Sequence, residues 1–399
     1  MLPGISRSRR QIAYAIKDME KRMTKENEAP TRPPVPECGY YLNSLYFYVT
    51  EGCNLRCSHC WINPPHETGN KAGKFPYVDL ELFKDIVYQA MELGCRSVKL
   101  TGGEPLIHPQ IFELLDFIKS EKLNLTIETN GTVCTPELVR KIRQCNATVS
   151  TSLDGPDAAT HERVRGVKGC FDATIQGLRY LVAADLNPQI IMAVMRHNRD
   201  KMEALVRLAE KEHAGSVKFT FVTSTGREND IAKDKEKTLY LEEIIETGKW
   251  IEKELIPNSK IPIVYSHPMA FKPINKAISR GSGSCGVFGV MGILGSGKYA
   301  LCGIGQTISE LVFADAKKER LADVWNHHPL LNEIREGLPK DLKGICAACM
   351  YRKKCLGSCI AMNYNHYRDL MAPNFFCHEA YQKGLFPEKY LIPGQKIEY

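Results

Sequence analysis

The stretch that decides the fold is a cysteine-rich segment directly after a short apolar run: Glu51-Gly52-Cys53-Asn54-Leu55-Arg56-Cys57-Ser58-His59-Cys60-Trp61. Its cysteines follow a C-x3-C-x2-C spacing, and three thiolates at this spacing can surround one corner of a cube and bind three irons of a [4Fe–4S] cluster. A structural cluster uses four protein ligands, so one iron stays open, which is typical of a reactive metal site. The apolar residues 44–50 predict a buried strand that ends at this loop.

This spacing after a first strand resembles the cluster loop of the radical S-adenosylmethionine (radical SAM) enzymes. In that family the amino and carboxylate groups of SAM chelate the open iron. One electron then cleaves SAM to a 5′-deoxyadenosyl radical, which removes a hydrogen atom from the substrate. The alternative is a set of three structural or zinc-binding cysteines, and motifs further along the chain favour the resemblance.

A second motif, Thr101-Gly102-Gly103-Glu104-Pro105, follows the next predicted strand at residues 96–100. Its glycines let the backbone approach a ligand closely, and the carboxylate of Glu104 can accept a hydrogen bond from an ammonium group. The motif resembles the family's GGEP segment. The resemblance implies that four residues hold the amino end of SAM: Gly102, Gly103, Glu104 and Pro105.

The third and fourth predicted strands, residues 125–131 and 147–155, also end in polar motifs. The Thr129-Asn130-Gly131 exit resembles the family's TNG segment near the ribose and methionine of SAM. The Ser152-Leu153-Asp154-Gly155 exit, followed by His161-Glu162-Arg163, is typical of the branch that modifies peptides and proteins.

In that branch a serine and an arginine bind the ribose or carboxylate of SAM. The resemblance assigns these roles to Ser152 and Arg163, with Arg165 as a close competitor. Asp154 is a candidate for substrate contact, with a turn cap as the alternative.

Further strands are predicted at residues 190–195 and 217–222, the second with an exit at Thr223–Arg227 that resembles the family's P-x-G-R segment. Amphipathic helices are predicted between the strands, at residues 79–93, 109–121, 136–144, 172–184 and 200–213. Strands that alternate with helices predict an α/β fold with a parallel sheet. Six such units predict a partial (β/α)6 TIM-like barrel, as in the family, whose open side admits a substrate larger than a metabolite.

Seven more cysteines lie in the last third of the chain: Cys285, Cys302, Cys346, Cys349, Cys355, Cys359 and Cys377. Their layout resembles the SPASM domain, which carries two auxiliary [4Fe–4S] clusters. By resemblance, the first cluster is bound by Cys285, Cys302 and Cys359, and the second by Cys346, Cys349, Cys355 and Cys377. The alternative is a zinc ribbon on Cys346, Cys349, Cys355 and Cys359, which leaves the other three cysteines unexplained.

Some relatives supply a fourth ligand to the first auxiliary cluster from a cysteine shortly after the equivalent of Cys285, whereas residues 286–292 contain none. Either this cluster has an open iron, which can bind a substrate thiolate, or a distant residue completes it. The remaining cysteines are Cys38, Cys95, Cys134, Cys145 and Cys170. Of these, Cys134 and Cys170 are candidate hydrogen-atom donors, with a buried structural thiol as the alternative. The catalytic candidates are therefore Asp154 and Cys134.

The 399 residues predict an N-terminal helix at 12–23 with a proline-rich linker (1–42), a radical SAM core (43–230), a bridging region (231–284) and a SPASM domain (285–399). The bridging region is expected to contain a helix at 238–255 and a short edge strand at 261–265. The sequence has no apolar stretch of about 18 residues and no secretory core at its start. With a net charge of +7, we expect a cytoplasmic protein with reduced cysteines that binds neither membrane nor nucleic acid.

The pairing of these two domains resembles the maturases of ribosomally made peptides. The resemblance implies hydrogen abstraction from a precursor peptide and an oxidative crosslink of the thioether, carbon–carbon or carbon–oxygen type. It also implies a flavodoxin or ferredoxin electron donor and leaves room for a separate peptide-recognition protein. The alternatives are a formylglycine-generating sulfatase maturase, a peptide epimerase, an enzyme acting on a cofactor precursor such as a small tetrapyrrole, and a non-catalytic iron–sulfur electron-transfer or zinc-binding protein.

Overall fold

The computed structural model describes residues 33–62, 75–222, 238–277 and 285–399. The chain forms two compact units, Met1–Val35 and Pro36–Tyr399, and the description below concerns the second. The predicted helix at 12–23 and the predicted strand exit at Thr223–Arg227 lie outside the described residues.

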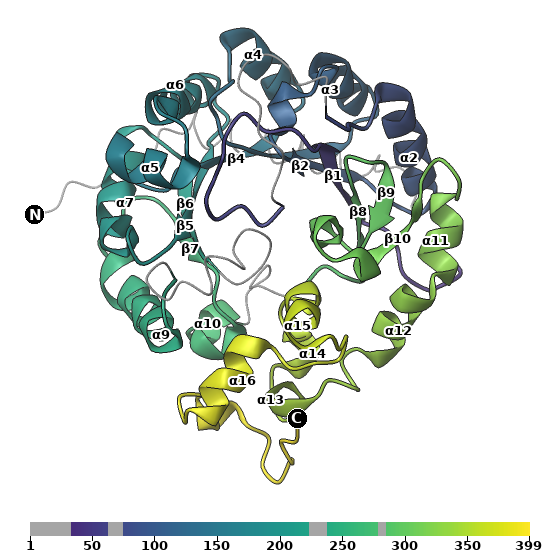
Figure 1. Cartoon of the computed structure of the whole chain (residues 1–399), viewed down its shortest axis with the longest axis vertical. Coiled ribbons are helices and arrows are strands. Elements are labelled where there is room, and N and C mark those ends of the chain that lie inside the picture. The colour runs from purple at the N-terminus through teal and green to yellow at the C-terminus, as the bar shows by residue number, and fades with distance from the viewer. Residues whose placement is uncertain (1–32, 63–74, 223–237, 278–284) are drawn as a thin grey trace, which may run out of the picture. The chain divides into compact units, whose positions relative to one another are not determined.

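A ten-stranded sheet forms the centre of the larger unit, in the order β10-β9-β8-β1-β2-β3-β4-β5-β6-β7. The strands are β1 (Ser44–Thr50), β2 (Ser97–Gly102), β3 (Asn124–Thr129), β4 (Thr148–Ser152), β5 (Gln189–Val194), β6 (Ser216–Phe221), β7 (Ile263–Tyr265), β8 (Val290–Ile293), β9 (Lys298–Ala300) and β10 (Val312–Asp315). Strands β1 to β7 pair in parallel, β8 pairs in parallel with β1, and β9 and β10 are antiparallel. The sheet has two edge strands, β7 and β10, so it forms an open barrel (Figure 1).

Helices follow the barrel strands and cover the outer face of the sheet (Figure 1). They are α2 (Leu80–Glu92), α3 (Ile111–Ser120), α4 (Pro136–Gln144), α5 (Ala158–Arg165), α6 (Cys170–Ala183), α7 (Met202–Lys211), α9 (Leu241–Trp250) and α10 (Ile274–Ala277). The helix ends follow from local sequence, since Asp79 accepts a hydrogen bond from the Leu82 amide at the start of α2 and Thr135 accepts one from the Leu138 amide at the start of α4. The α/β barrel expected from the sequence is therefore confirmed.

Two predicted elements differ in detail from the structure. The helix expected at 238–255 is α9 followed by one π-helical turn, Ile251–Leu255. Helix α5 was not predicted, because its eight residues are mostly polar and show no long apolar period. Asp157 caps the start of α5, and Gly166, with a φ of 72°, ends it in the left-handed conformation that favours glycine. The edge strand expected at 261–265 is present as β7.

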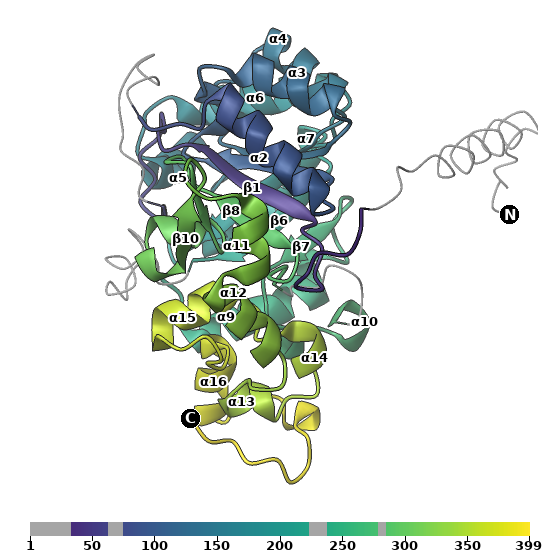
Figure 2. The ribbon, with the colours of Figure 1, turned by 90° about the vertical axis from the view of Figure 1, so that its right-hand side faces the viewer.

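The last third of the chain contributes to the barrel as well as to the region beyond it. Strands β8, β9 and β10 extend the sheet from β1, and short helices then lead away from it (Figure 2). These helices are α11 (Leu321–His327), α12 (Pro329–Gly337), α13 (Gly344–Ala347), α14 (Arg352–Cys355), α15 (Ile360–Tyr367) and α16 (Phe375–Gln382). The expected domain boundaries stay a prediction. Within the described ranges, no helix is long and apolar enough to cross a membrane.

Candidate active site

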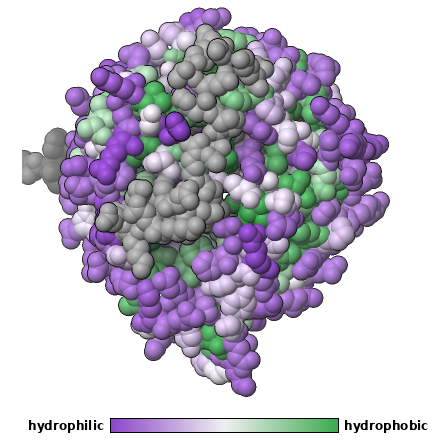
Figure 3. All heavy atoms as spheres, viewed as in Figure 1, coloured by the Kyte–Doolittle hydropathy of each residue, from purple (hydrophilic) through white to green (hydrophobic). Residues whose placement is uncertain are grey.

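A cavity of about 530 Å³ lies inside the barrel and reaches the carboxyl ends of its strands. Residues from β1 to β6, from the cysteine loop after β1 and from the last third of the chain line it. Figure 3 shows one face of the molecule, where hydrophilic side chains dominate the periphery and hydrophobic side chains gather nearer the centre. Side chains that are far apart in the sequence therefore line one common space.

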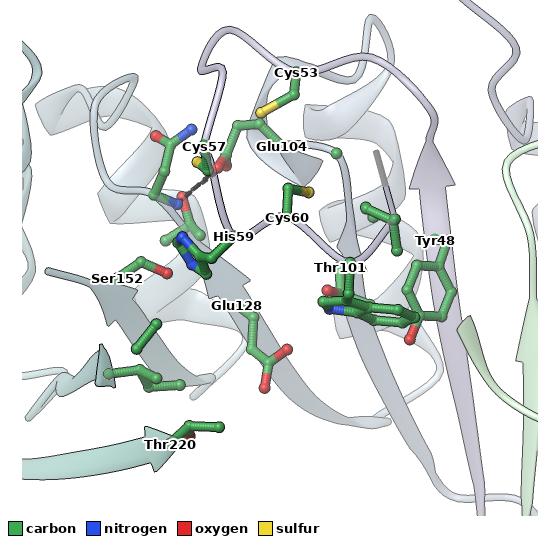
Figure 4. Close-up of a pocket in the computed structure, with 18 of the residues that line it drawn as sticks. Tyr48, Cys53, Cys57, His59, Cys60, Thr101, Glu104, Glu128, Ser152 and Thr220 are labelled. Carbon is green, nitrogen blue, oxygen red and sulfur yellow. Dashed lines mark hydrogen bonds between the residues drawn. The ribbon is translucent and has the colours of Figure 1, made fainter. Parts of the chain in front are cut away.

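Three thiols of the cysteine loop, Cys53, Cys57 and Cys60, face this cavity (Figure 4). The loop rests on the end of α5, because the Arg56 amide donates to the Arg165 carbonyl at 3.0 Å. Burial and the neighbouring Cys57 thiol raise the pKa of Cys53 above its usual range. Such a thiol stays protonated unless a bound cation stabilises its thiolate form.

The Gly102-Gly103-Glu104 turn packs directly against this loop. The Glu104 amide donates to the Gly52 carbonyl at 2.9 Å, and a Cβ at position 103 would collide with that same carbonyl oxygen. Gly103 is therefore required for the two segments to approach each other. Gly102, Gly103 and Glu104 line the cavity, whereas Pro105 is buried beside it without lining it.

The Glu104 carboxylate is buried and held by three donors. It accepts hydrogen bonds from the Thr129 hydroxyl at 2.6 Å, the Asn130 amide at 2.7 Å and the Leu106 amide at 3.1 Å. Burial raises its pKa to about 7, and the hydrogen bonds oppose this rise. A carboxylate has about four acceptor positions, so Glu104 keeps one for a ligand in the cavity.

The exits of β3 and β4 place three more of the predicted residues around the cavity. Thr129, Asn130 and Ser152 all line it, and the Asn130 side-chain amide donates to the Asn54 side chain of the cysteine loop at 2.8 Å. Figure 4 shows Ser152 between the cysteine loop and the deeper side chains of the barrel.

The structure brings Arg165 to the cavity in place of Arg163. Arg163 is exposed and does not line the cavity, whereas Arg165 is buried and lines it. Its guanidinium Nη1 lies 3.5 Å from the Cys57 sulfur, and its Nε lies 2.6 Å from an Asp154 carboxylate oxygen. The two arginines lie on different faces of α5, so Arg165 is the one that can reach a ligand in the cavity, and the assignment of either arginine to SAM stays a prediction.

Neither catalytic candidate from the sequence reaches the cavity. Asp154 is fully buried, accepts a hydrogen bond from the Ala193 amide at 2.9 Å and pairs with Arg165. Burial alone would raise its pKa, but the Arg165 guanidinium lowers it below the usual value. Cys134 is buried behind the cavity wall, and burial together with the charge of Glu104 raises its pKa to about 12. Asp154 thus positions Arg165, and Cys134 lies where a structural thiol would.

A second group of thiols meets the cavity from the last third of the chain. Cys302 and Cys359 line it, so they share this space with the cysteine loop. Burial and the nearby Cys285 raise the pKa of Cys302 to about 11, and burial, Cys285 and Cys302 raise that of Cys359 to about 12. The three thiols thus lie close enough to act on one another electrostatically.

The remaining four cysteines surround a separate pocket of about 20 Å³: Cys346, Cys349, Cys355 and Cys377. Burial raises the pKa of Cys377 well above its usual value, and the other three thiols add to this rise. Cys359 is not in this pocket, so the structure does not assemble the four cysteines of the zinc-ribbon alternative. Across the described ranges, no three His, Cys, Asp or Glu side chains are placed to share a single metal ion. The ligand sets proposed from the sequence stay predictions.

Sequence reasoning missed the polar side chains deeper in the barrel. Tyr46, Tyr48, Lys99, Glu128 and Lys218 all line the cavity. The signal was present, since β2, β3 and β6 alternate polar and apolar residues, whereas parallel strands buried on both faces read as continuous apolar runs.

The model of the Radical SAM superfamily matches residues 47–209, which include the three cysteines of the loop, Glu104 and Arg165. The chain contains a radical SAM domain and is an enzyme.

Relatives of this enzyme span most of its length. A protein of Methanosarcina barkeri named AdoMet-dependent heme synthase is 27% identical over 356 residues, which cover 82% of this chain and 94% of that protein. The mycofactocin maturase MftC of Mycobacterium tuberculosis is 23% identical over 361 residues, which cover 89% of this chain and 88% of MftC. The structure of Streptococcus suis SuiB bound to the precursor peptide SuiA has the same fold, with a TM-score of 0.65 and 17% identity. The match covers 94% of this chain and 82% of the SuiB chain.

The residues present fit the groups that the family implies, a [4Fe–4S] cluster and SAM. The cysteine loop alone brings three thiols, those of Cys53, Cys57 and Cys60, to the cavity, which is the donor set of a cluster with an open iron. The free acceptor position of Glu104 and the Arg165 guanidinium offer opposite charges to the ammonium and carboxylate of a bound amino acid. The close contact of Gly103 with Gly52 keeps these groups next to the thiols.

Proposed function

We propose that this enzyme modifies a ribosomally made precursor peptide, by removing a hydrogen atom and forming an oxidative crosslink of the thioether, carbon–carbon or carbon–oxygen type. One observation carries the proposal. The thiols of the cysteine loop and the thiols of Cys302 and Cys359 face the same cavity, so one substrate can contact both groups at once.

The chain's own residues bind and orient SAM in this proposal. Cys53, Cys57 and Cys60 hold the cluster, which, once reduced, supplies the electron that cleaves SAM to a 5′-deoxyadenosyl radical. Glu104 accepts a hydrogen bond from the ammonium of SAM, and Arg165 pairs with its carboxylate, while Ser152 contacts the ribose. The surrounding barrel keeps water away from the site, which is the protein's part in cofactor chemistry of this kind.

The second and third thiol groups are assigned to auxiliary clusters. Cys285, Cys302 and Cys359 hold the first, beside the substrate, and the pocket of Cys346, Cys349, Cys355 and Cys377 holds the second. Forming an oxidative crosslink removes two hydrogens from the substrate. The 5′-deoxyadenosyl radical would take one as a hydrogen atom, and the other would leave as a proton and an electron. An auxiliary iron–sulfur cluster would accept that electron. A flavodoxin or ferredoxin is the proposed donor for the first cluster, and a separate peptide-recognition protein remains a proposed partner.

The named relatives support a peptide substrate. MftC is named as a maturase, a Bacillus subtilis relative is named as a subtilosin biosynthesis protein, and SuiB was solved with its precursor peptide. The formylglycine-generating alternative is less favoured because residues 286–292 lack the cysteine expected there. A non-catalytic electron carrier is not supported, since the chain is an enzyme of the radical SAM superfamily.

A second candidate function is the conversion of a cofactor precursor such as a tetrapyrrole. It is favoured by the relatives named AdoMet-dependent heme synthase, of which the enzyme covers up to 94%. Both candidates require the same SAM cleavage, so the substrate distinguishes them.

The test uses anaerobically purified enzyme reconstituted with iron and sulfide, then mixed with SAM and a strong reductant. We expect 5′-deoxyadenosine, which the Cys57→Ala variant should not form. Candidate precursor peptides deuterated at single residues should transfer deuterium into 5′-deoxyadenosine and lose two hydrogens in mass per crosslink. Turnover of a tetrapyrrole, and of no peptide, would instead establish the second candidate.

A further inference from the structure

We propose that Lys218, inside the barrel, binds a carboxylate group of the substrate. The inference rests on the proposed function and narrows its substrate to peptides that bring a carboxylate into the cavity, either a chain terminus or an acidic side chain.

Lys218 lies on β6 and lines the cavity together with Thr220, which is labelled in Figure 4. In the sheet it lies opposite Ile191 of β5 and Val264 of β7. Because residues two apart on a strand share a face, Lys218 lies one step farther than Thr220 from the strand end at which the cysteine loop lies. Through Ile191 of β5 it is at the register level of Ser152, which ends β4.

The other charged side chains of the cavity already have partners. Lys99 lies 2.6 Å from Glu128, Arg165 lies 2.6 Å from Asp154, and Glu104 accepts three hydrogen bonds. In the described part of the chain Lys218 has neither an ion pair nor a hydrogen bond. Among the residues that the structure describes, Lys218 is thus the lysine of the cavity without a compensating carboxylate.

A second cation makes this part of the cavity more attractive to an anion. Burial lowers the pKa of Lys272, the charge of Glu252 opposes this, and the charges of Lys276 and then of the nearby Lys218 lower it further. The Lys272 ammonium lies 5.2 Å from the centre of the Tyr265 ring. Glu252 also acts on Lys272, but one of its carboxylate oxygens is 2.6 Å from Lys276. An anion at Lys218 therefore also reduces the repulsion between Lys218 and Lys272.

A carboxylate is the peptide group that fits this position. An ammonium offers three donors and no acceptor, and its hydrogen bonds to a carboxylate are about twice as strong as those between neutral groups. A neutral amide would leave the charge of Lys218 uncompensated in a half-buried place. The carboxylate of SAM is the competing ligand, so the test includes SAM alone.

The test measures how fast methyl acetimidate, which reacts with free lysine amines, labels Lys218 in the full, reconstituted enzyme without reductant. Labelling is read by peptide mass spectrometry, with exposed Lys249 of α9 as the internal control. The probes are N-acetylglycine, which has a terminal carboxylate, N-acetylglutamate amide, which has a side-chain carboxylate, and the neutral N-acetylglycinamide. Each probe is used at about 100 mM in the presence of SAM and at constant ionic strength. This probe concentration is enough to fill a site with a dissociation constant of ~10 mM.

We expect at least one carboxylate probe to slow the labelling of Lys218 about fivefold or more, relative to the neutral amide, while Lys249 is unaffected. The more protective probe identifies the source of the carboxylate. Equal labelling with all three probes overturns the inference, and so does full protection by SAM alone. No reductant is present, so a failure here is independent of whether the enzyme cleaves SAM or modifies a peptide.

Discussion

Arg165 depends on Asp154 for its place in the cavity. A buried guanidinium costs several kcal/mol in lost hydration unless an opposite charge lies beside it, and Asp154 provides that charge at 2.6 Å. Asp154 is itself fixed by the Ala193 amide of β5. The pair therefore ties the last turn of α5 to the neighbouring strand and directs the guanidinium toward Cys57.

We expect the Asp154→Asn variant to lose about 3 kcal/mol of unfolding free energy, because removing one partner leaves an uncompensated buried charge. Urea unfolding of the apoprotein measures this loss. The matched control is Asp172→Asn, at an exposed position of α6, which should change stability by less than about 0.5 kcal/mol. Equal effects of the two variants would contradict the role given to Asp154.

The buried carboxylate of Glu104 predicts pH-dependent binding of SAM. Its pKa is raised to about 7, so the charged form that attracts an ammonium is present above pH 7 and is lost as the pH falls through that value. We therefore expect the dissociation constant of SAM, measured by equilibrium dialysis, to rise by about tenfold between pH 8 and pH 6. Glu104→Gln should bind SAM weakly at both pH values. A Gln variant that kept the wild-type pH dependence would show that another group titrates.

At the scale of elements, the sequence predicted the strand exits well and the inner faces of the strands poorly. The C-x3-C-x2-C loop, Glu104 and Ser152 could be placed because each follows an apolar run that ends at a polar motif. The choice between Arg163 and Arg165 could not be made from the sequence. Side chains two positions apart on a helix point in directions about 200° apart, and α5 has too few apolar residues to show which of its faces is the inner one. The arrival of Cys302 and Cys359 at the cavity depends on contacts between distant parts of the chain, which no local pattern encodes.

The start of α9 offers an element-scale prediction. Glu243 accepts from the Tyr240 amide at 2.7 Å and pairs with Arg196, at 2.6 Å for each of two contacts. The hydrogen bonds from Arg196 lower the pKa of the Glu243 carboxyl below its usual value. Its contribution to stability is therefore present above the unfolded-state value of about 4.3 and is lost as the pH falls through the lowered value.

We expect Glu243→Gln to lower the unfolding free energy by about 1–2 kcal/mol at pH 7 and to match the wild type at the lowest pH where both still fold. Glu246→Gln, an exposed carboxylate of the same helix, is the control and should be nearly neutral at pH 7. A difference between Glu243→Gln and wild type that grows on acidification would contradict this assignment.

At the scale of the whole molecule, three thiol groups predict three separable clusters. We expect about twelve irons per chain in the reconstituted enzyme, and about eight both in the Cys53/Cys57/Cys60→Ala variant and in a Cys346/Cys377→Ala variant. Cys145→Ala, which changes a thiol outside the three groups, should keep the full content. About four irons with one zinc per chain would contradict the auxiliary clusters and remove the proposed electron acceptor.

The parallel pairing of β1 with β8 also affects how the chain is made. Strand β1 ends at Thr50 and its partner begins at Val290, so the ribosome must add the intervening residues before this edge is covered. At ~5–20 residues per second this delay is roughly ten to fifty seconds. Throughout that time the nascent barrel has an exposed edge strand, a known site of aggregation, and lacks Cys302 and Cys359. A stalled chain would then be a client for chaperones rather than a partly active enzyme, and iron–sulfur loading of the shared cavity would have to follow translation.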